Sequence, residues 1–339
     1  MRFAAIVLTK GFVCMRPLLT QAPNASFSLE KNVWADFIEL QCLLSTDKEI
    51  SLSDVISMAT EEGPNELNRG SNRASEQDDK VYRAFADVFK FIENRAQILG
   101  TAYPFTIVDE DTISVNLESA SVEQVLYLFL LYSSNLSLFR KNEQQRLTSA
   151  FESAAKYVLQ QIYPSHSVEV FGTASSEGNI FHGGKLIERF EKLAQCLHTE
   201  VTNVTRRNPR YDRASGDGGL DLVGFIQLDH EHSKVPFIPM CFAQCACSVD
   251  KWVEKQGSIK YDTWNQRFER LAPYVELIFV PFSLRGADGK WSDEEADRMT
   301  VIPIDRIRFI HIIESNREYL NAFKETDAYQ VVNESINEL

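Results

Sequence analysis

Cysteine is scarce in this chain of 339 residues, with six copies at positions 14, 42, 196, 241, 245 and 247. None forms a CxxC pair of the kind that structural zinc sites use, and no regular spacing indicates a disulfide framework. Cys241, Cys245 and Cys247 share one face of an apolar run, which predicts small core residues rather than zinc ligands. The cysteines therefore favour a reducing, cytoplasmic location over secretion.

Long apolar runs are also missing. The most hydrophobic stretch, residues 125–138, is interrupted by serines and is shorter than a bilayer requires, so we expect a buried helix there. Lys10 cuts short the apolar run that follows Arg2, which argues against a signal peptide. Together with a hydrophobic content of 44%, these features predict a soluble globular protein that does not enter a membrane.

Positive charge is in short supply, because the net charge is −13. Nonspecific affinity for nucleic acid comes largely from neutralising phosphates, so this balance argues against a protein that coats DNA or RNA. The deficit is uneven, however. Residues 181–260 hold 11 Lys or Arg against 10 Asp or Glu, and the rest of the chain carries the excess of acid. A nucleic-acid site is therefore compatible with that segment.

Helical spacing of apolar residues dominates the first half of the chain. It predicts helices over residues 33–44, 52–60, 81–99, 121–138 and 144–162, and a hairpin over residues 105–108 and 112–115. The length favours two domains, whose boundary we place near residues 164–166. Residues 1–165 would then form a mainly helical domain with a role in target recognition or assembly.

The second domain, residues 166–339, mixes helical and strand patterns. A helix is predicted over residues 184–198, a strand over 200–205, and a hairpin from the apolar runs 220–226 and 235–247. Further along, the pattern predicts a short helix with Ser248 as its N-cap, ended by Gly257, then helices over 261–271 and 306–316, and strands over 274–280 and 300–304.

The most informative motif lies where that hairpin begins. Residues 216–221 have the sequence Gly-Asp-Gly-Gly-Leu-Asp, so a tight turn carries Asp221 into the first strand. Side chains alternate along a strand, so Gln244 and Ala246 share one side of the second strand, and Gln244 can lie beside Asp221. Neighbouring carboxylate and amide oxygens are typical ligands of a hard divalent cation.

This arrangement resembles the restriction endonuclease-like PD-(D/E)xK nuclease superfamily, in its branch with Gln in place of Glu. The resemblance covers residues 170–305 and implies a core of helix, three antiparallel strands, helix and strand. The expected fold class is α/β (α+β), with a central mixed sheet flanked by helices. The resemblance also implies that Asp221 and Gln244 hold Mg²⁺, or alternatively Mn²⁺, while Asp217 either joins these ligands or only shapes the turn.

The lysine of this superfamily is replaced here by Ala246. In similar proteins the lysine has moved to the following helix, and Lys251 and Lys255 share one face of the helix expected here. The resemblance thus gives the catalytic role to Lys255, then to Lys251, unless both are solvated helix lysines. Relatives also take a metal ligand from the first helix, for which Glu188 is the first candidate and Glu191 the second, unless both are exposed acids.

Four arginines come shortly before the glycine-rich turn, namely Arg206, Arg207, Arg210 and Arg213. Arginine pairs with phosphate through two parallel hydrogen bonds, so a loop leading into the active-site strand is well placed to hold a nucleic-acid backbone. A solvated basic loop, or a surface for the acidic remainder of the chain, would have the same composition.

The resemblance implies a metal-dependent endonuclease that hydrolyses DNA in restriction or anti-phage defence. A protein partner from the same defence system and assembly as a homo-oligomer are both compatible with that role. The alternative is an inactive nuclease-fold module that binds nucleic acid or a protein partner, which the replaced lysine supports. A third interpretation is an unrelated interaction protein whose glycine-rich segment is only a loop.

Overall fold

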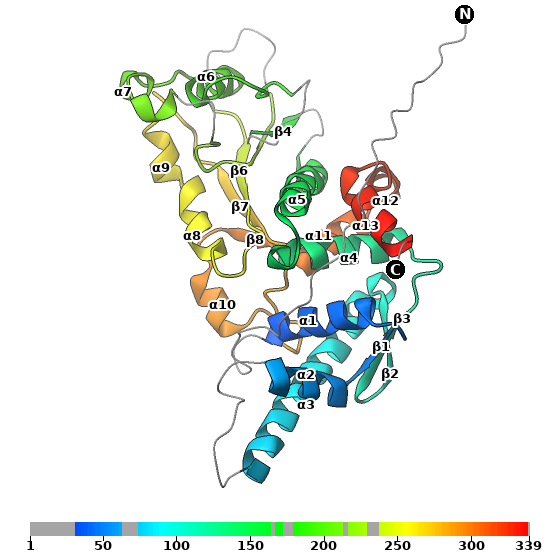
Figure 1. Cartoon of the computed structure of the whole chain (residues 1–339). Coiled ribbons are helices and arrows are strands. Elements are labelled where there is room, and N and C mark those ends of the chain that lie inside the picture. Colours follow the sequence, from blue (N-terminus) through cyan, green and yellow to red (C-terminus); the bar gives the residue numbers. More distant parts are fainter. Residues whose placement is uncertain are drawn as a thin grey trace, which may run out of the picture.

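The computed structural model describes residues 31–62, 74–163, 167–171, 179–212, 216–228 and 237–337. These residues form an α+β protein with two sheets, in which the N-terminal part is mainly helical (Figure 1). No helix among them is both long and apolar enough to cross a bilayer.

All five helices predicted in the first half are present, and so is the predicted hairpin. A short strand, β1, was not predicted and completes a small antiparallel sheet in the order β1-β3-β2. The elements of this part are α1 (Lys31–Leu44), β1 (Glu49–Ser51), α2 (Leu52–Glu62), α3 (Ala74–Leu99), β2 (Phe105–Asp109), β3 (Thr112–Val115), α4 (Val122–Ser134) and α5 (Lys141–Ile162).

The rest of the chain builds a five-stranded mixed sheet in the order β4-β5-β6-β7-β8. The first three strands are antiparallel, whereas β7 and β8 run parallel to β6. The elements are β4 (Val168–Val170), α6 (Leu186–Cys196), α7 (Asn203–Arg206), β5 (Leu222–Phe225), β6 (Met240–Cys245), α8 (Trp252–Gln256), α9 (Tyr261–Asn265), β7 (Val275–Phe279), α10 (Asp293–Arg298), β8 (Ile302–Ile304), α11 (Arg306–Glu314), α12 (Arg317–Phe323) and α13 (Asp327–Asn337).

The predicted hairpin of β5 and β6 is confirmed, although the turn at residues 229–236 lies outside the described residues. Its register pairs Leu222 with Ala243, so Asp221 and Gln244 lie at the next step of the ladder. The alternation expected along β6 is also confirmed: Cys241 and Cys245 pack into the core on one face of the sheet, and Ala246 packs into the core on the other.

The strand expected over residues 200–205 is absent, because this segment makes a single bridge at Val201 and then forms the short helix α7. The Thr202 side chain accepts a hydrogen bond from the backbone N–H of Thr205 and so starts a helix instead. The first strand of the sheet is β4, and the helix that precedes it is α5. Helix α6 is therefore an insertion between β4 and β5.

Helix α5 packs directly on β4, β5 and β6 and covers one face of the sheet (Figure 1). The hydrophobic core on this face is continuous from α1, α3, α4 and α5 to the sheet and on to α11 and α13. This core therefore contains residues from both predicted domains, and the predicted boundary at residues 164–166 lies outside the described residues. The opposite face packs on α6, α8 and α9 around Phe190, Trp252 and Trp264.

A buried ionic cluster also joins the two halves. Arg306, at the start of α11, donates from Nη1 and Nη2 to the two carboxylate oxygens of Asp36 on α1, at 2.9 and 2.6 Å. Arg95 of α3 donates to Asp36 and Glu39, at 2.8 and 2.7 Å. Burial alone would raise the pKa of Asp36, but the two arginines outweigh it and lower that pKa. The cluster is thus a set of paired charges that ties α1 and α3 to the sheet domain.

Candidate active site

The glycine-rich turn before β5 has a conformation that only glycine adopts readily. Gly216, Gly218 and Gly219 have φ values of 101°, 66° and 85°, in the region that side chains disfavour. The Asp217 carboxylate accepts a hydrogen bond from the N–H of Gly219 at 2.7 Å, and so shapes the turn as predicted. Arg189 of α6 donates to the carbonyl of Gly216 at 2.5 Å and holds the turn against that helix.

The side chains of Asp221, which directly follows this turn, and Gln244 are in contact. Both side chains are 4% exposed, and Gln244 Nε2 donates to Asp221 Oδ2 at 2.5 Å. The backbone N–H of Cys245 donates to the same oxygen at 2.7 Å. The Ser258 hydroxyl, which the sequence did not single out, lies 2.8 Å from Gln244 Oε1 and is shared with the carbonyl oxygens of Lys255 and Gly219, at 2.6 and 3.0 Å, so it places a donor beside the amide oxygen.

Lys255 reaches the same place from α8. Its ammonium donates to the carbonyl oxygen of Cys245 at 2.8 Å, one residue before Ala246. Its positive charge lowers the pKa of both Asp221 and Glu152. Lys251 lies on the exposed first part of the same segment and makes no side-chain contact with these residues. The structure therefore brings Lys255, and not Lys251, to Asp221.

A third carboxylate comes from α5, a helix that the sequence assigned to the other domain. Glu152 Oε2 is buried and has no hydrogen-bond partner among the described residues. Its pKa is raised to about 8 by burial, and further by the negative charges of Asp221 and Asp217. An acid that is buried, unpaired and close to other acids is costly to ionise, which is typical of functional sites.

The same physics acts on Asp221. Its pKa is raised to about 7, first by burial and then by the neighbouring charge of Asp217, against the favourable hydrogen bond from the N–H of Cys245. Asp217, Asp221 and Glu152 thus form a group of acids that repel one another next to Lys255. A bound cation would relieve this repulsion.

The donors present fit a hard divalent cation, because carboxylate and amide oxygens are what Mg²⁺ prefers. The orphaned Glu152 Oε2 supports this fit more directly, since it is a buried oxygen with nothing to bind. Within the described residues, no three His, Cys, Asp or Glu side chains converge closely enough to form a ready-made cage. An ion would therefore need Gln244 or small movements of the acids to complete its ligands.

Glu188 was expected to supply a metal ligand, but the structure places its side chain away from Asp221 and Gln244. Glu188 lies in the first turn of α6, and its carboxylate accepts a hydrogen bond from the backbone N–H of Lys185, as a helix cap. Glu191, the second candidate, pairs with Arg206 at 3.5 Å. Neither contacts Asp221 or Gln244. The cause is the insertion of α6 between β4 and β5, which leaves α5 as the helix that faces the site.

The arginines before the turn are spread over an exposed surface. Arg206 pairs with Glu191, whereas the side chains of Arg207 and Arg210 are exposed and form no ion pair within the described part of the chain. Arg213 lies outside the described residues. Arg267, which was not predicted, approaches the turn from beyond α9 and donates to the carbonyl of Gly218 at 3.1 Å.

A signal for Glu152 was present in the sequence. Val168 and Val170 alternate with Glu169 just before Phe171, which is the pattern of a short strand. Reading that strand as the first of the sheet identifies α5 as the preceding helix and directs attention to its acids. Comparisons with models of protein families, with curated proteins and with solved structures find no match for this chain, so its function has to be inferred from this site.

Proposed function

We propose that this protein is a divalent-metal-dependent endonuclease that hydrolyses DNA. The observation that supports this most is the grouping of Asp221, Glu152, Gln244 and Lys255 at one end of a mixed sheet. Acids with raised pKa values beside a lysine are suited to holding a cation next to a phosphodiester.

The order of elements adds support. The run α5-β4-β5-β6-α8-β7 consists of helix, three antiparallel strands, helix and strand, if the insertion of α6 and α7 is set aside. This is the order that the resemblance to PD-(D/E)xK nucleases implies. Because one fold hosts many activities, the weight of the proposal rests on the site.

Asp221 and Glu152 would hold the ion, with Asp217 and the Gln244 amide as further oxygen donors. A bound Mg²⁺ or Mn²⁺ ion would neutralise negative charge on the phosphate and lower the pKa of a water molecule bound to it. Ser258 and the Cys245 N–H keep Gln244 and Asp221 in place, so the acid does not have to reorganise.

Lys255 would take the role of the superfamily's lysine, whose position in this chain is occupied by Ala246. Its ammonium is anchored at 2.8 Å from the Cys245 carbonyl, so it adds a fixed positive charge beside the acids. In that position it orients a water molecule or stabilises the negative charge that develops on the phosphate. Arg207 and Arg210, which are exposed on the loop before the turn, would hold the flanking phosphates.

The decisive experiment compares two glutamates. We expect the parent protein to nick or cut plasmid DNA with Mg²⁺ or Mn²⁺, and Glu152→Gln to abolish this activity. Glu188→Gln is the matched control, because its carboxylate only caps α6, and it should cut like the parent. If Glu152→Gln keeps full activity, the assignment of this site is wrong.

The same assay separates the alternatives. Offering RNA of the same sequence shows whether the sugar matters, and addition of a co-purifying partner tests for a defence complex. If the parent cuts neither nucleic acid with any divalent ion, the inactive nuclease-fold module becomes the better interpretation. The observation that favours it is the buried Ala246 in place of the superfamily's lysine.

A further inference from the structure

A pocket opens directly beside the candidate active site. Its volume is about 530 Å³, within the range of small-molecule pockets. The glycine-rich turn forms one wall, and α9 and the short 3-10 helix Pro209–Tyr211 contribute others. The walls include Arg210, Tyr211, Asp217, Ser258, Thr263 and Arg267.

The pocket is lined by two arginines and one acid. One of these arginines, Arg267, is held in position by its contacts with the surrounding protein. The guanidinium of Arg267 lies 4.1 Å from the ring centre of Trp264 and donates to the carbonyl of Gly218, which fixes its position. Burial lowers the pKa of Arg267 below its usual value, although that value is so high that the charge remains. Arg210 is exposed at the rim.

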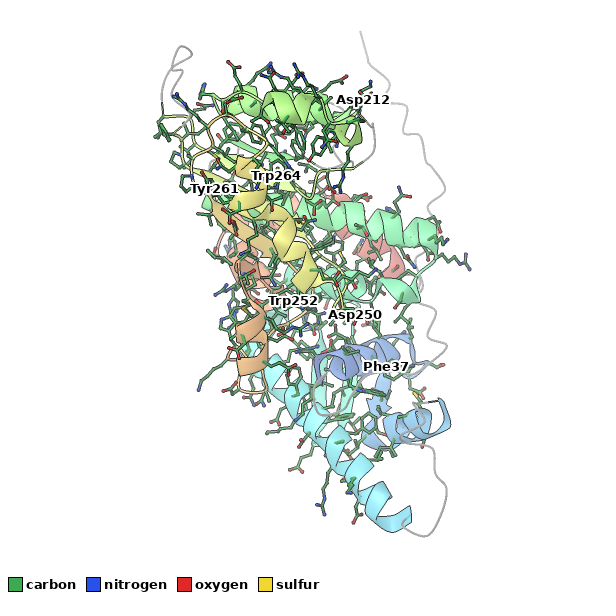
Figure 2. All side chains as sticks on the ribbon, turned by 90° about the vertical axis from the view of Figure 1, so that its left-hand side faces the viewer. Phe37, Asp212, Asp250, Trp252, Tyr261 and Trp264 are labelled. Atoms are coloured by element: carbon green, nitrogen blue, oxygen red, sulfur yellow. The ribbon has the colours of Figure 1, made fainter. Side chains whose placement is uncertain are left out.

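The aromatic wall is also held in place. The Tyr211 ring packs edge-on against Phe190, with ring centres 5.2 Å apart, and lies 5.8 Å from the Arg267 guanidinium. Next to it, Asp212 pairs with Lys185 at 2.6 Å and ties the loop to the start of α6. Figure 2 shows Asp212 near α6, with Tyr261 and Trp264 along α9. An arginine pair beside an aromatic ring is suited to a phosphate that carries a flat base.

Two residues that line the pocket also interact with the residues of the candidate active site. Asp217 lines the pocket, and its charge also raises the pKa of Asp221. Ser258 lines the pocket and donates to Gln244 as well. A group seated in the pocket would thus lie next to the proposed metal site.

We propose that this pocket binds one unpaired nucleotide of the nucleic-acid substrate, with its phosphate at Arg210 and Arg267 and its base against Tyr211. This inference rests on the proposed function and names the substrate class: DNA with an unpaired nucleotide at an end, flap or gap. The volume is larger than a phosphate alone needs. A nucleotide inside such a pocket is removed from its stacked neighbours, which costs least when it is unpaired.

The test uses the full chain in EDTA, so that binding is measured without cleavage. The probes are a labelled 12-nucleotide single strand, a blunt hairpin duplex, dTMP and inorganic phosphate. We expect the single strand to bind at least tenfold more tightly than the duplex, and dTMP to compete where phosphate at the same concentration does not. Arg210→Gln should weaken single-strand binding roughly 10- to 100-fold, because a charge-assisted contact is lost. Thr263→Phe should do the same by filling the pocket.

Each variant has a control outside the pocket. Arg270→Gln removes an exposed arginine three residues from Arg267, and Gln266→Phe introduces the same aromatic side chain at an exposed position three residues from Thr263 and outside the pocket. Both should bind like the parent, and thermal melting confirms that every variant is folded.

Equal binding by parent, Arg210→Gln and Thr263→Phe, or equal affinity for single strand and duplex, would overturn the proposal. If dTMP binds but the single strand does not, the ligand is a free nucleotide and the nucleic-acid assignment is wrong. Cleavage of plasmid that depends on Glu152 would still support the nuclease, so failure of this inference is distinguishable from failure of the proposed function.

Discussion

Asp221 and Glu152 are held in the folded protein with pKa values of about 7 and about 8, above the ordinary 3.8 and 4.5. From about pH 4 to about pH 8 the folded state therefore retains protons that the unfolded chain has released, so stability falls as pH rises through this range. Ionisation of these two acids therefore destabilises the folded state, and a bound cation would offset that destabilisation.

Neutral amides at these positions should relieve that cost. In EDTA, Asp221→Asn and Glu152→Gln are expected to melt at higher temperatures than the parent at pH 8.5, and to gain less at pH 5.5, where the parent acids are protonated. Calorimetry at the two pH values measures this. For Glu188→Gln, at a helix cap outside the site, we expect no such pH-dependent gain. Equal gains at both pH values would mean that the charges do not repel as described.

Lys255 and Lys251 form a second residue-level contrast, because only Lys255 reaches the Cys245 carbonyl. Lys255→Ala should lower the rate of DNA cleavage by roughly 100-fold or more, while DNA affinity changes little, because one catalytic charge is lost and few phosphate contacts are. Single-turnover cleavage and equilibrium binding separate the two effects. Lys251→Ala serves as the control, and equal loss in both variants would point to general electrostatics. Restoration of some activity by adding Ala246→Lys to Lys255→Ala would show that the charge, not its origin, matters.

At the scale of elements, the glycine-rich turn fixes how β5 enters the site. A Cβ on Gly219 would lie 2.6 Å from the Cβ of Ser258, whereas a Cβ on Gly216 would meet nothing within 4 Å. Both glycines have positive φ, so alanine strains the backbone at both, by about 1–3 kcal/mol.

Only Gly219→Ala should also displace Ser258 and so release the Gln244 amide. We expect it to lose more cleavage activity than Gly216→Ala at a similar loss of stability. Chemical denaturation and cleavage rates measured on both variants test this. If the two lose activity equally, backbone strain alone accounts for the effect and Ser258 does not position Gln244.

Most of the elements were readable from the sequence, because amphipathic spacing in α1 to α5 and apolar runs in β5, β6 and β7 are local signals. Asp221 and Gln244 also followed from local spacing, since a hairpin brings them together, whereas Lys255 was indicated by the resemblance to nucleases whose lysine lies on the next helix. Glu152 followed from neither. Its role depends on α5 packing across the sheet, a contact between distant segments that no periodicity encodes. The alternation in β4 indicates a strand, but a strand of three residues does not by itself show that it is the first of the sheet on which α5 packs.

At the scale of the whole molecule, Arg306 and Asp36 join the halves through a fully buried pair. Arg306→Met leaves Asp36 with Arg95 as its one remaining charged partner among the described residues, and should cost about 3–5 kcal/mol of unfolding free energy. Because the core on this side of the sheet is continuous, the variant should still unfold in one transition. Urea denaturation followed by tryptophan fluorescence and by circular dichroism tests both points. Two separated transitions would contradict the single cooperative unit.

Glu152 is encoded in the first half of the chain, and Asp221, Gln244 and Lys255 in the second. On the proposed function, the two halves have to be inherited together. Recombination that replaced residues 1–163 with a diverged counterpart would exchange an acid of the candidate active site along with any recognition surface on the helices. Selection on such a hybrid would act first on how well α5 of the new segment packs on the retained sheet. The two halves of this protein should therefore evolve as one gene rather than as exchangeable modules.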